Sequence, residues 1–495
     1  MLYTSTRDNR VAVPSAQAIA QGLSREGGLF LPRQMPKVYL MELGTLAEMN
    51  YVDRAEYILS KFLTSEGLWE RDEVLSCAQA AYTGTFRSKF IAPVKSLDNN
   101  TEILELFHGP TCAFKDLALQ IMPRLLTAAA KKVMPEKELV ILVATSGDTG
   151  KAALEGFRDV EGTKIVVFYP EQGVSPVQKR QMTTQTGKNV RVVAVRGNFD
   201  DTQNGVKAIF SDPGIRREAE ARGQEFTSAN SINWGRLVPQ IVYYFSAYCD
   251  LMNKKRIKQG EKINFVVPTG NFGNILAGWY AKQMGLPIHK LICASNQNRV
   301  LADFFQSGQY DRNRPFHLTA SPSMDILISS NLERLLYLTA RQNNASITAE
   351  WMRQLSHAGR YEIPPLMHQA LQKEFFGGSC NETQCAAAIR KAWETQDYLS
   401  DPHTAVALHV LDEYRAATGD ATRSVVIATA SPYKFAASVL DSLGVAVPED
   451  EFAALAALED LSKIPCPEPL RGLQKKRERF SDVCDTGEMA KWIQI

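Results

Sequence analysis

The stretch His108-Gly-Pro-Thr-Cys-Ala-Phe-Lys-Asp-Leu-Ala-Leu-Gln120 places one lysine, Lys115, where a loop turns into an apolar helix. Far downstream, Pro268-Thr-Gly-Asn-Phe-Gly-Asn274 follows a strand pattern and precedes a helical one. Gly270 and Gly273 let several backbone amides converge at the start of that helix, where the positive dipole end suits a phosphate group. Alone, such a turn is often only a connection. Together, the two loops predict a reactive amine beside a bound phosphate.

Lys115 has apolar neighbours, among them Phe114, Leu117 and Leu119. A free lysine has a pKa of about 10.4, so a useful amine must be desolvated or paired. A covalent imine with an aldehyde cofactor meets this need, and the amine that is later released carries protons. The alternative from local context is an ordinary exposed helix lysine paired with Asp116.

Composition narrows the classes of protein. The chain of 495 residues is too long for one ordinary domain, and 45% apolar with 22% charged residues is typical of a soluble globular protein. A formal charge of +2 builds no broad basic field, so we expect no nucleic-acid partner. The eight cysteines form no CxxC pair and the histidines show no metal spacing, so we expect no metal and a reducing compartment. Without a signal peptide or a long apolar run, the expectation is a cytoplasmic protein with no membrane contact.

Strand and helix patterns alternate from residue 138 onward. Because alternation favours parallel sheets covered by helices, the sequence predicts an α/β fold with ligands at the carboxyl ends of strands. The glycine-bearing loops at 146–150 and 269–274 lie at such ends. Between about 331 and 400 the pattern is helical with poor strand signals. The predicted strands are 138–144, 163–169, 190–195, 263–268, 290–295 and 424–430, and the predicted helices among them include 149–157, 176–186 and 274–285.

The loop Ala144-Thr-Ser-Gly-Asp-Thr-Gly-Lys-Ala-Ala-Leu154 has the position of a nucleotide-binding P-loop but not its spacing. Only two residues separate Gly147 from Gly150, and Ala152 stands where a hydroxyl would bind magnesium. A turn that binds a carboxylate through Ser146, Gly147 and Thr149 fits better. The alternative is a plain helix cap.

The stretch Ser228-Ala-Asn-Ser-Ile-Asn-Trp-Gly-Arg-Leu237 gathers donors ahead of an apolar helix. Arg236 is suited to grip a second phosphate, since its guanidinium makes two parallel charged hydrogen bonds. A capped helix with a surface arginine is the alternative.

These four loops, in this order, resemble the longer branch of the threonine synthase family, which consists of fold-type II enzymes dependent on pyridoxal phosphate (PLP). The resemblance runs almost end to end and includes EGGLFLP (26–32), NSINWGRLVPQIVYYF (230–245), SMDILISSNLERLLY (323–337), DPHTAV (401–406) and ATASPYKFA (428–436). It implies a fold like that of the tryptophan synthase β chain, with two parallel-type sheet domains covered by helices and a helical N-terminal domain. The implied domains are a helical N-terminal domain (1–95), the start of the PLP-binding large domain (96–135), a small mobile domain (136–235), and the rest of the large domain (236–495) with a helical insert at about 331–400.

The resemblance also assigns residues. It implies that Lys115 forms the Schiff base with PLP and shuttles protons, and that the hydroxyl of Thr429 faces the pyridine nitrogen. Ser431 departs from the histidine that many relatives carry, and His108 lies next to the lysine loop. The implied phosphate loop of the cofactor is Gly270, Asn271, Phe272, Gly273 and Asn274. The implied substrate-binding residues are Ser146, Gly147, Asp148, Thr149, Lys151, Asn230, Ser231 and Arg236.

The implied reaction converts O-phospho-L-homoserine and water to L-threonine and phosphate, the last step of threonine biosynthesis, in a monomer or homodimer. One alternative is a lyase that releases 2-oxobutyrate from the same substrate, because only the control of the last water differs. A non-catalytic protein that binds a phosphorylated metabolite is an alternative from another class.

Overall fold

The computed structural model describes residues 1–145, 147–172, 174–341 and 343–493. Its first sheet has six strands in the order β13-β10-β9-β14-β4-β3, all parallel except β3, which pairs antiparallel with β4. The bounds are β3 Val94–Ser96, β4 Thr101–Glu105, β9 Ile263–Pro268, β10 Ile288–Ser295, β13 Phe375–Ser379 and β14 Ser424–Ala428.

A second sheet of five parallel strands has the order β15-β7-β6-β5-β8. Its strands are β5 Glu138–Ala144, β6 Thr163–Pro170, β7 Val190–Arg196, β8 Gln224–Thr227 and β15 Val483–Asp485. The predicted strands 138–144 and 263–268 have the same bounds in the structure, because each is an apolar run that ends at a polar turn. The prediction of two parallel-type sheets covered by helices is confirmed.

The N-terminal part combines four helices with a pair of short antiparallel strands, β1 Tyr3–Ser5 and β2 Phe30–Pro32. Its helices pack on the rest of the chain through α1 against α6 and through α3 against α12. Asn50 caps α3 by accepting from the amides of Val52 and Asp53. The bounds are α1 Ser15–Gln21, α2 Leu40–Glu48, α3 Tyr51–Leu63 and α4 Arg71–Tyr82.

The remaining helices cover the two sheets. They are α5 Lys115–Leu119, α6 Met122–Val133, α7 Asp148–Phe157, α8 Pro176–Thr183, α9 Phe199–Ser211, α10 Pro213–Ala221, α11 Trp234–Leu237, α12 Pro239–Asn253, α13 Gly273–Met284 and α14 Val300–Ser307. Toward the C-terminus follow α15 Leu332–Thr339, α16 Ala345–Ala358, α17 Pro365–Glu374, α18 Glu382–Gln396, α19 Pro402–Thr418, α20 Ala436–Ser442 and α21 Glu451–Ser462.

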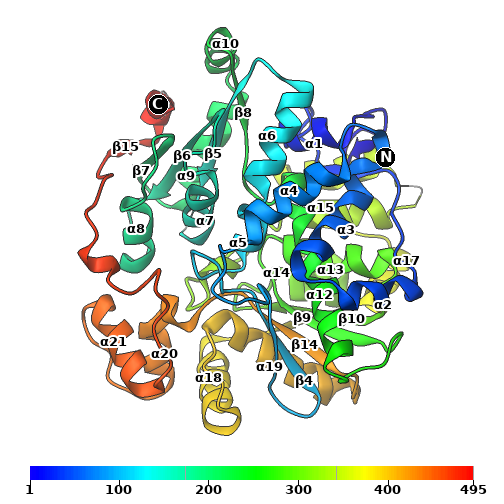
Figure 1. Cartoon of the computed structure of the whole chain (residues 1–495), viewed down its shortest axis with the longest axis vertical. Coiled ribbons are helices and arrows are strands. Elements are labelled where there is room, and N and C mark those ends of the chain that lie inside the picture. The colour runs from blue at the N-terminus through cyan, green and yellow to red at the C-terminus, as the bar shows by residue number, and fades with distance from the viewer. Residues whose placement is uncertain (146, 173, 342, 494–495) are drawn as a thin grey trace.

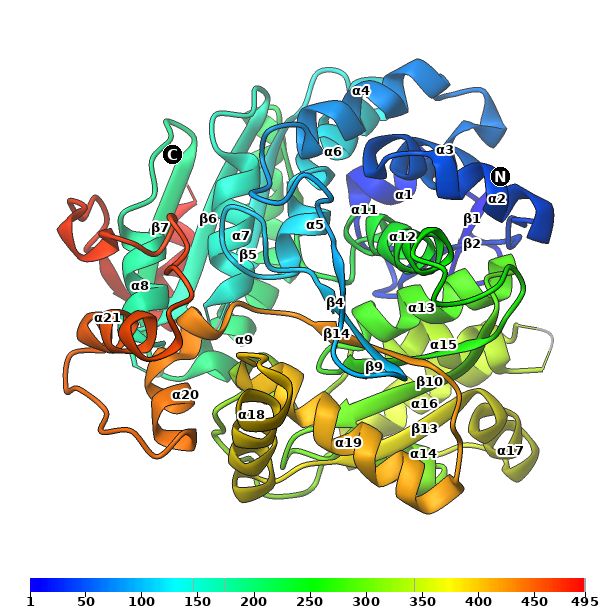
Figure 2. The same ribbon diagram turned by 60° about the horizontal axis from the view of Figure 1, so that its bottom comes forward.

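Helix α5, which begins at Lys115, lies between the two sheets in both ribbon views (Figures 1 and 2). It contacts α7 of the second sheet and both α11 and α12, which lie toward the first. The loops that precede α7 and α13 leave the carboxyl ends of β5 and β9. This arrangement brings the carboxyl edges of both sheets to the start of α5, as expected for parallel α/β folds.

Two details differ from the sequence predictions. The segment 331–400 is not wholly helical, because β13 pairs in parallel with β10 at the edge of the first sheet. Gly377 and Gly378 in this strand hide its signal, since glycine has a poor strand propensity. In addition, β15 returns to the second sheet, whereas the predicted domain 236–495 assigns the whole C-terminal part to the first.

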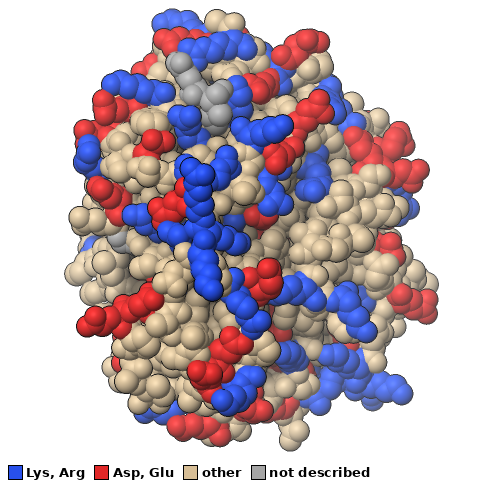
Figure 3. All heavy atoms as spheres, turned by 60° about the vertical axis from the view of Figure 1, so that its left-hand side comes forward, with Lys and Arg blue, Asp and Glu red and all other residues tan. Residues whose placement is uncertain are grey.

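The exposed run Lys475–Arg479 lies against α8, where Arg479 N donates to Thr183 O over 2.8 Å. Figure 3 shows this side of the molecule, on which a band of Lys and Arg is surrounded by Asp and Glu. Mixed signs of this kind agree with the near-neutral net charge of +2. Within the described ranges, the longest apolar helices fall short of what a bilayer crossing requires.

Candidate active site

Lys115 is buried at the first position of α5, with only 9% of its surface exposed. Its Nζ donates to Ser323 Oγ over 3.1 Å and lies 3.6 Å from Asp148 Oδ2. Burial lowers the pKa of Lys115 to about 8; Asp148 opposes this, and the positive charges of Lys434 and Arg236 reinforce it. The local alternative, an exposed lysine paired with Asp116, is therefore wrong. An amine with this pKa is partly neutral near pH 7, as a nucleophile or proton carrier must be.

Asp116 follows Lys115 in the sequence, but its carboxylate is hydrogen-bonded to Thr111 and not to Lys115. Its carboxylate accepts from Thr111 N over 2.8 Å and from Thr111 Oγ1 over 2.7 Å. Burial raises the pKa of Asp116 to about 6, and the bonds from Thr111 act against that rise. Asp116 thus fixes the turn that precedes Lys115.

Asp148 joins the two sheets at the site. Asp148 lies in the first turn of α7. Its Oδ1 forms an ion pair with Lys434 Nζ at 2.6 Å and accepts a hydrogen bond from Gln178 Nε2 over 2.8 Å. Burial works to raise the pKa of Asp148, but Lys434 and Lys115 outweigh it and hold that pKa well below its ordinary value. Lys434 is itself fully buried and also donates to Thr111 O over 3.1 Å. One carboxylate therefore lies between two buried ammonium groups.

The loop 270–274 has the open backbone that the sequence predicts for a phosphate site. Phe272 adopts a left-handed conformation (φ 64°), and α13 begins at the next residue, so its first-turn amides have no partner within the helix. A Cβ on Gly270 would lie 2.5 Å from Ser323 O, which explains the need for glycine. Asn274 is held by Tyr243 and Tyr244, yet its Nδ2 is buried without a partner.

The loop 228–237 lies against the loop 270–274. A Cβ on Gly273 would be 3.3 Å from Ser231 Cβ, and Asn331 Nδ2 bridges Ser231 Oγ (2.9 Å) and Asn271 O (3.0 Å). Arg334, fully buried, donates to Ser231 O and Ile232 O and so fixes the same turn.

Arg236 is a buried cation that has no counter-ion among the described residues. It donates from Nη1 to Ala229 O over 2.9 Å, its Nε has no partner, and within the described ranges it forms no ion pair. Burial lowers the pKa of Arg236 to about 10. Asn230 Oδ1 is likewise buried without a partner. Unpaired buried polar groups are costly, so these atoms fit a polar ligand: the Arg236 Nε donor suits an anion, and the Asn230 Oδ1 acceptor suits a hydrogen-bond donor of the same ligand.

The remaining predicted residues surround the same point. Gly147 (φ 140°) precedes α7, and its N donates to Thr145 Oγ1 over 3.0 Å. Thr149 is half-buried in the first turn of α7. Thr429 is buried after β14, and its O accepts from Phe114 N over 2.7 Å, beside Lys115. Ser146 lies outside the described residues.

Lys151 and His108 already have partners within the protein. Lys151 pairs with Glu155 at 2.9 Å and with Gln185, so in this structure its ammonium is already satisfied one turn from the site. His108 is bound to Glu105 Oε2 at 2.9 Å. The main chain of Ser431 is hydrogen-bonded to the lysine loop, since Ser431 N donates to Cys112 O over 3.0 Å.

Sequence reasoning missed Lys434, Ser323, Asn331 and Gln178 as parts of the site. The first three fall inside quoted blocks of the resemblance, so those blocks carried the signal. Gln178 lies on the predicted helix 176–186, where no local pattern marks it.

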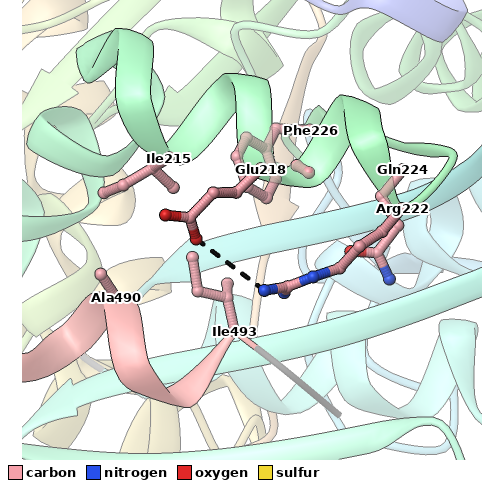
Figure 4. A pocket seen from close by; sticks show the side chains of 8 residues that line it. Ile215, Glu218, Arg222, Gln224, Phe226, Ala490 and Ile493 are labelled. Atoms are coloured by element: carbon pink, nitrogen blue, oxygen red, sulfur yellow. Dashed lines mark ion pairs between the residues drawn. The ribbon is translucent and has the colours of Figure 1, made fainter.

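A cavity of about 50 Å³ lies elsewhere, between α10, β8 and the C-terminal segment (Figure 4). Apolar groups such as Ile215, Phe226 and Ile493 line it, together with the Glu218–Arg222 pair at 3.8 Å. It has room for a few water molecules only, and it shares no residue with the site around Lys115.

Comparison with known protein families first defines the class of enzyme to which the chain belongs. Residues 103–430 match the family model described as "Pyridoxal-phosphate dependent enzyme", and this range contains Lys115, the 270–274 loop and Thr429. Residues 2–82 match "Threonine synthase N terminus" and residues 404–493 match "Threonine synthase, C-terminal".

Individual relatives agree with these models. The chain is 37% identical over 467 residues to threonine synthase of Saccharomyces cerevisiae, covering 89% of each chain, and 40% identical over 481 residues to human threonine synthase-like 1, covering 95% of this chain. A crystal structure of PLP-bound threonine synthase from Brucella melitensis superposes with a TM-score of 0.87 and 36% identity, covering 100% of this chain and 98% of that one. The chain belongs to the threonine synthase family of fold-type II, PLP-dependent enzymes. It spans 64% of the length of threonine synthase-like 1.

Proposed function

We propose that this protein binds PLP and converts O-phospho-L-homoserine and water to L-threonine and phosphate. The observation that carries the proposal is that one site contains both a buried, partly neutral Lys115 and a buried Arg236 that has no counter-ion among the described residues. Family membership supports the same reaction. When bound, the cofactor supplies an electron sink for negative charge that develops on the substrate carbons.

Three groups would hold the cofactor. Lys115 is the amine that bonds to it, and the 270–274 loop, at the start of α13, holds its phosphate. The Thr429 hydroxyl faces the ring nitrogen. Because a hydroxyl is neutral, it does not hold a full positive charge on that nitrogen as a carboxylate would.

The substrate lies between the two loops that flank Lys115. Ser146, Gly147, Asp148 and Thr149 at the start of α7 bind its α-carboxylate side. Asn230, Ser231 and Arg236 bind its phosphate, and Lys151 contributes once it leaves Glu155. This arrangement holds Cα near Lys115 Nζ and the leaving oxygen at Cγ near the guanidinium.

Lys115 removes the proton from Cα and then a proton from Cβ, so that phosphate leaves from Cγ; one of these protons is delivered to Cγ, and the other returns to Cα after the water has added. The released phosphate stays on Arg236 and takes a proton from the water that adds at Cβ. Closure of the segment 136–235 over the substrate keeps other water away until that step.

The test is a product assay with the purified, PLP-loaded protein and O-phospho-L-homoserine. Threonine and phosphate in equal amounts are expected. Appearance of 2-oxobutyrate in place of threonine would identify the lyase alternative. Tight binding of the substrate without any product, unchanged in Lys115→Ala, would favour a binding protein.

We further propose that the protein acts in the cytoplasm as a monomer or homodimer. All eight cysteines are buried free thiols, which suits a reducing compartment. Light scattering of the purified protein tests the assembly, and a larger particle would contradict it.

A further inference from the structure

The motif Asp401-Pro-His-Thr-Ala-Val406 has no role in the reaction as described so far. It opens α19, and both Asp401 and His403 are buried (1% and 2% exposed). A buried histidine beside a buried aspartate requires an explanation, because such polar groups are costly unless they are hydrogen-bonded.

The histidine bonds in one tautomer only. Ser323 N donates to His403 Nε2 over 3.2 Å, so Nε2 carries the lone pair and the proton lies on Nδ1. Nδ1 then donates to Asp401 Oδ2 over 2.8 Å. Asp401 is fixed in turn, because it caps α19 by accepting from His403 N (2.9 Å) and Thr404 N (3.2 Å).

The segment that carries Ser323 is also held from its other side. Asp325 accepts from Asn296 Nδ2 over 2.7 Å and from Thr319 N over 3.0 Å, just beyond the end of β10. Ser323 O packs so closely on the phosphate loop that a Cβ on Gly270 would lie 2.5 Å away. Ser323 is therefore placed between the phosphate loop and Lys115 with little freedom to move.

The Ser323 hydroxyl reaches the reacting nitrogen directly, since Lys115 Nζ donates to Ser323 Oγ over 3.1 Å. This bond uses one Nζ hydrogen and restricts rotation about the Cε–Nζ bond. It therefore fixes the direction of the lone pair when the amine is neutral. We propose that Ser323 holds Lys115 Nζ in its reacting position whenever that nitrogen is a free amine, and that His403 and Asp401 are positioning residues that hold Ser323. The inference rests on the proposed function, in which Lys115 bonds to PLP and carries protons.

The test compares four variants of the full-length chain. Ser323→Ala removes the hydroxyl. His403→Phe keeps a ring against Phe435, whose centroid lies 4.9 Å away, but removes the acceptor. His403→Gln places an amide oxygen near the former Nε2, and His409→Phe makes the same change as His403→Phe on the same helix, away from the site.

Two quantities are measured: the rate of colour formation when PLP is added to the PLP-free protein, and the kinetic constants of the loaded enzyme. We expect Ser323→Ala and His403→Phe to slow colour formation about tenfold and to lower kcat about tenfold, with KM within about twofold. His403→Gln recovers most of both, and His409→Phe matches the parent. A purely structural role would not separate kcat from KM or be rescued by glutamine.

The outcomes are distinct. Parental rates of colour formation and kcat in Ser323→Ala would overturn the inference, as would equal damage from the Gln and Phe substitutions at His403. If His403→Phe does not fold, Ser323→Ala decides alone, since it removes one oxygen atom. A parent protein that forms no colour at all would instead refute the proposed function.

Discussion

The site has two ends, one around Lys115 and one around Arg236, and they differ in how their buried charges are paired. At the lysine end, Asp148 lies between Lys434 (2.6 Å) and Lys115 (3.6 Å), so positive and negative groups are paired. At the arginine end, Arg236 contacts a single carbonyl oxygen, and two nearby buried atoms, Arg236 Nε and Asn230 Oδ1, have no partner. The lysine end is complete in the protein alone, whereas the arginine end lacks an anion.

This difference assigns the two ends to different tasks. A paired cluster keeps Lys115 in place and its pKa at about 8 before any ligand arrives. In the proposed role of Arg236, a phosphate dianion would bind the unpaired guanidinium favourably, because folding has already removed the guanidinium from water. The contrast predicts that equivalent changes at the two ends have opposite consequences.

Lys434→Met should produce the largest effect. Removing one partner of a buried ion pair leaves Asp148 with only Lys115, and we expect the free energy of unfolding to fall by about 3 kcal/mol. Urea denaturation of the ligand-free protein measures this. Adding Asp148→Asn should restore part of the loss, because the buried carboxylate is gone and Lys115, whose pKa is already lowered to about 8, can become a neutral amine; a single variant as stable as the parent would mean that the pair is not formed.

Arg236→Ala should lower kcat/KM by about 10- to 100-fold, since a charged hydrogen bond contributes about 1.5–3 kcal/mol. The cofactor should remain bound with its colour intact, because the 270–274 loop is unchanged. Steady-state kinetics and the visible spectrum of the same sample check both statements. Loss of colour in this variant would show that Arg236 holds the cofactor phosphate instead.

Arg236→Met should stabilise the ligand-free protein by about 1 kcal/mol, opposite in sign to Lys434→Met. An unpaired buried charge is replaced by an apolar chain of similar length, which removes a desolvation penalty. The two variants are compared by urea denaturation with and without inorganic phosphate. Phosphate should stabilise the parent and leave the variant unaffected; a less stable variant would contradict the idea of a poised, unpaired cation.

Asp116→Asn should have a smaller, pH-dependent effect. Burial raises the pKa of Asp116 from 3.8 to about 6, so its contribution to stability is complete below about pH 4 and is lost as the pH rises through 6. The asparagine side chain can accept from Thr111 N and donate to Thr111 Oγ1, so the variant should exceed the parent in stability by about 1–2 kcal/mol at pH 7.5. Denaturation at pH 4 and pH 7.5 tests the sign: an advantage that does not shrink at pH 4 would be inconsistent with this titration.

Much of the fold could be predicted from the sequence because local signals and tertiary structure agree. Strands such as β5 and β9 are continuous apolar runs that end at glycine-containing turns, and parallel sheets place such turns at one edge. The strand β13 could not be predicted, since two glycines weaken its pattern and only pairing with β10 stabilises it. The return of β15 to the second sheet depends in the same way on a partner distant in sequence.

The site likewise contains residues that the sequence predicts and residues that it does not. The loops around Lys115, Gly270 and Arg236 carry recognisable residue patterns, and the structure brings them together. Lys434 lies inside the quoted block 428–436, but the sequence does not show its role there, because that role comes from the approach of Asp148, which belongs to the other sheet. The roles of the individual residues in binding and chemistry stay predictions.

The most direct test of the account distinguishes the two buried lysines that flank Asp148, Lys115 and Lys434. PLP-loaded protein is reduced with borohydride, digested, and the labelled peptide is identified by mass spectrometry. The account predicts a single label on Lys115, whose amine is held by Ser323 and has its pKa lowered to about 8. A label on Lys434, or no label on either lysine, would contradict it.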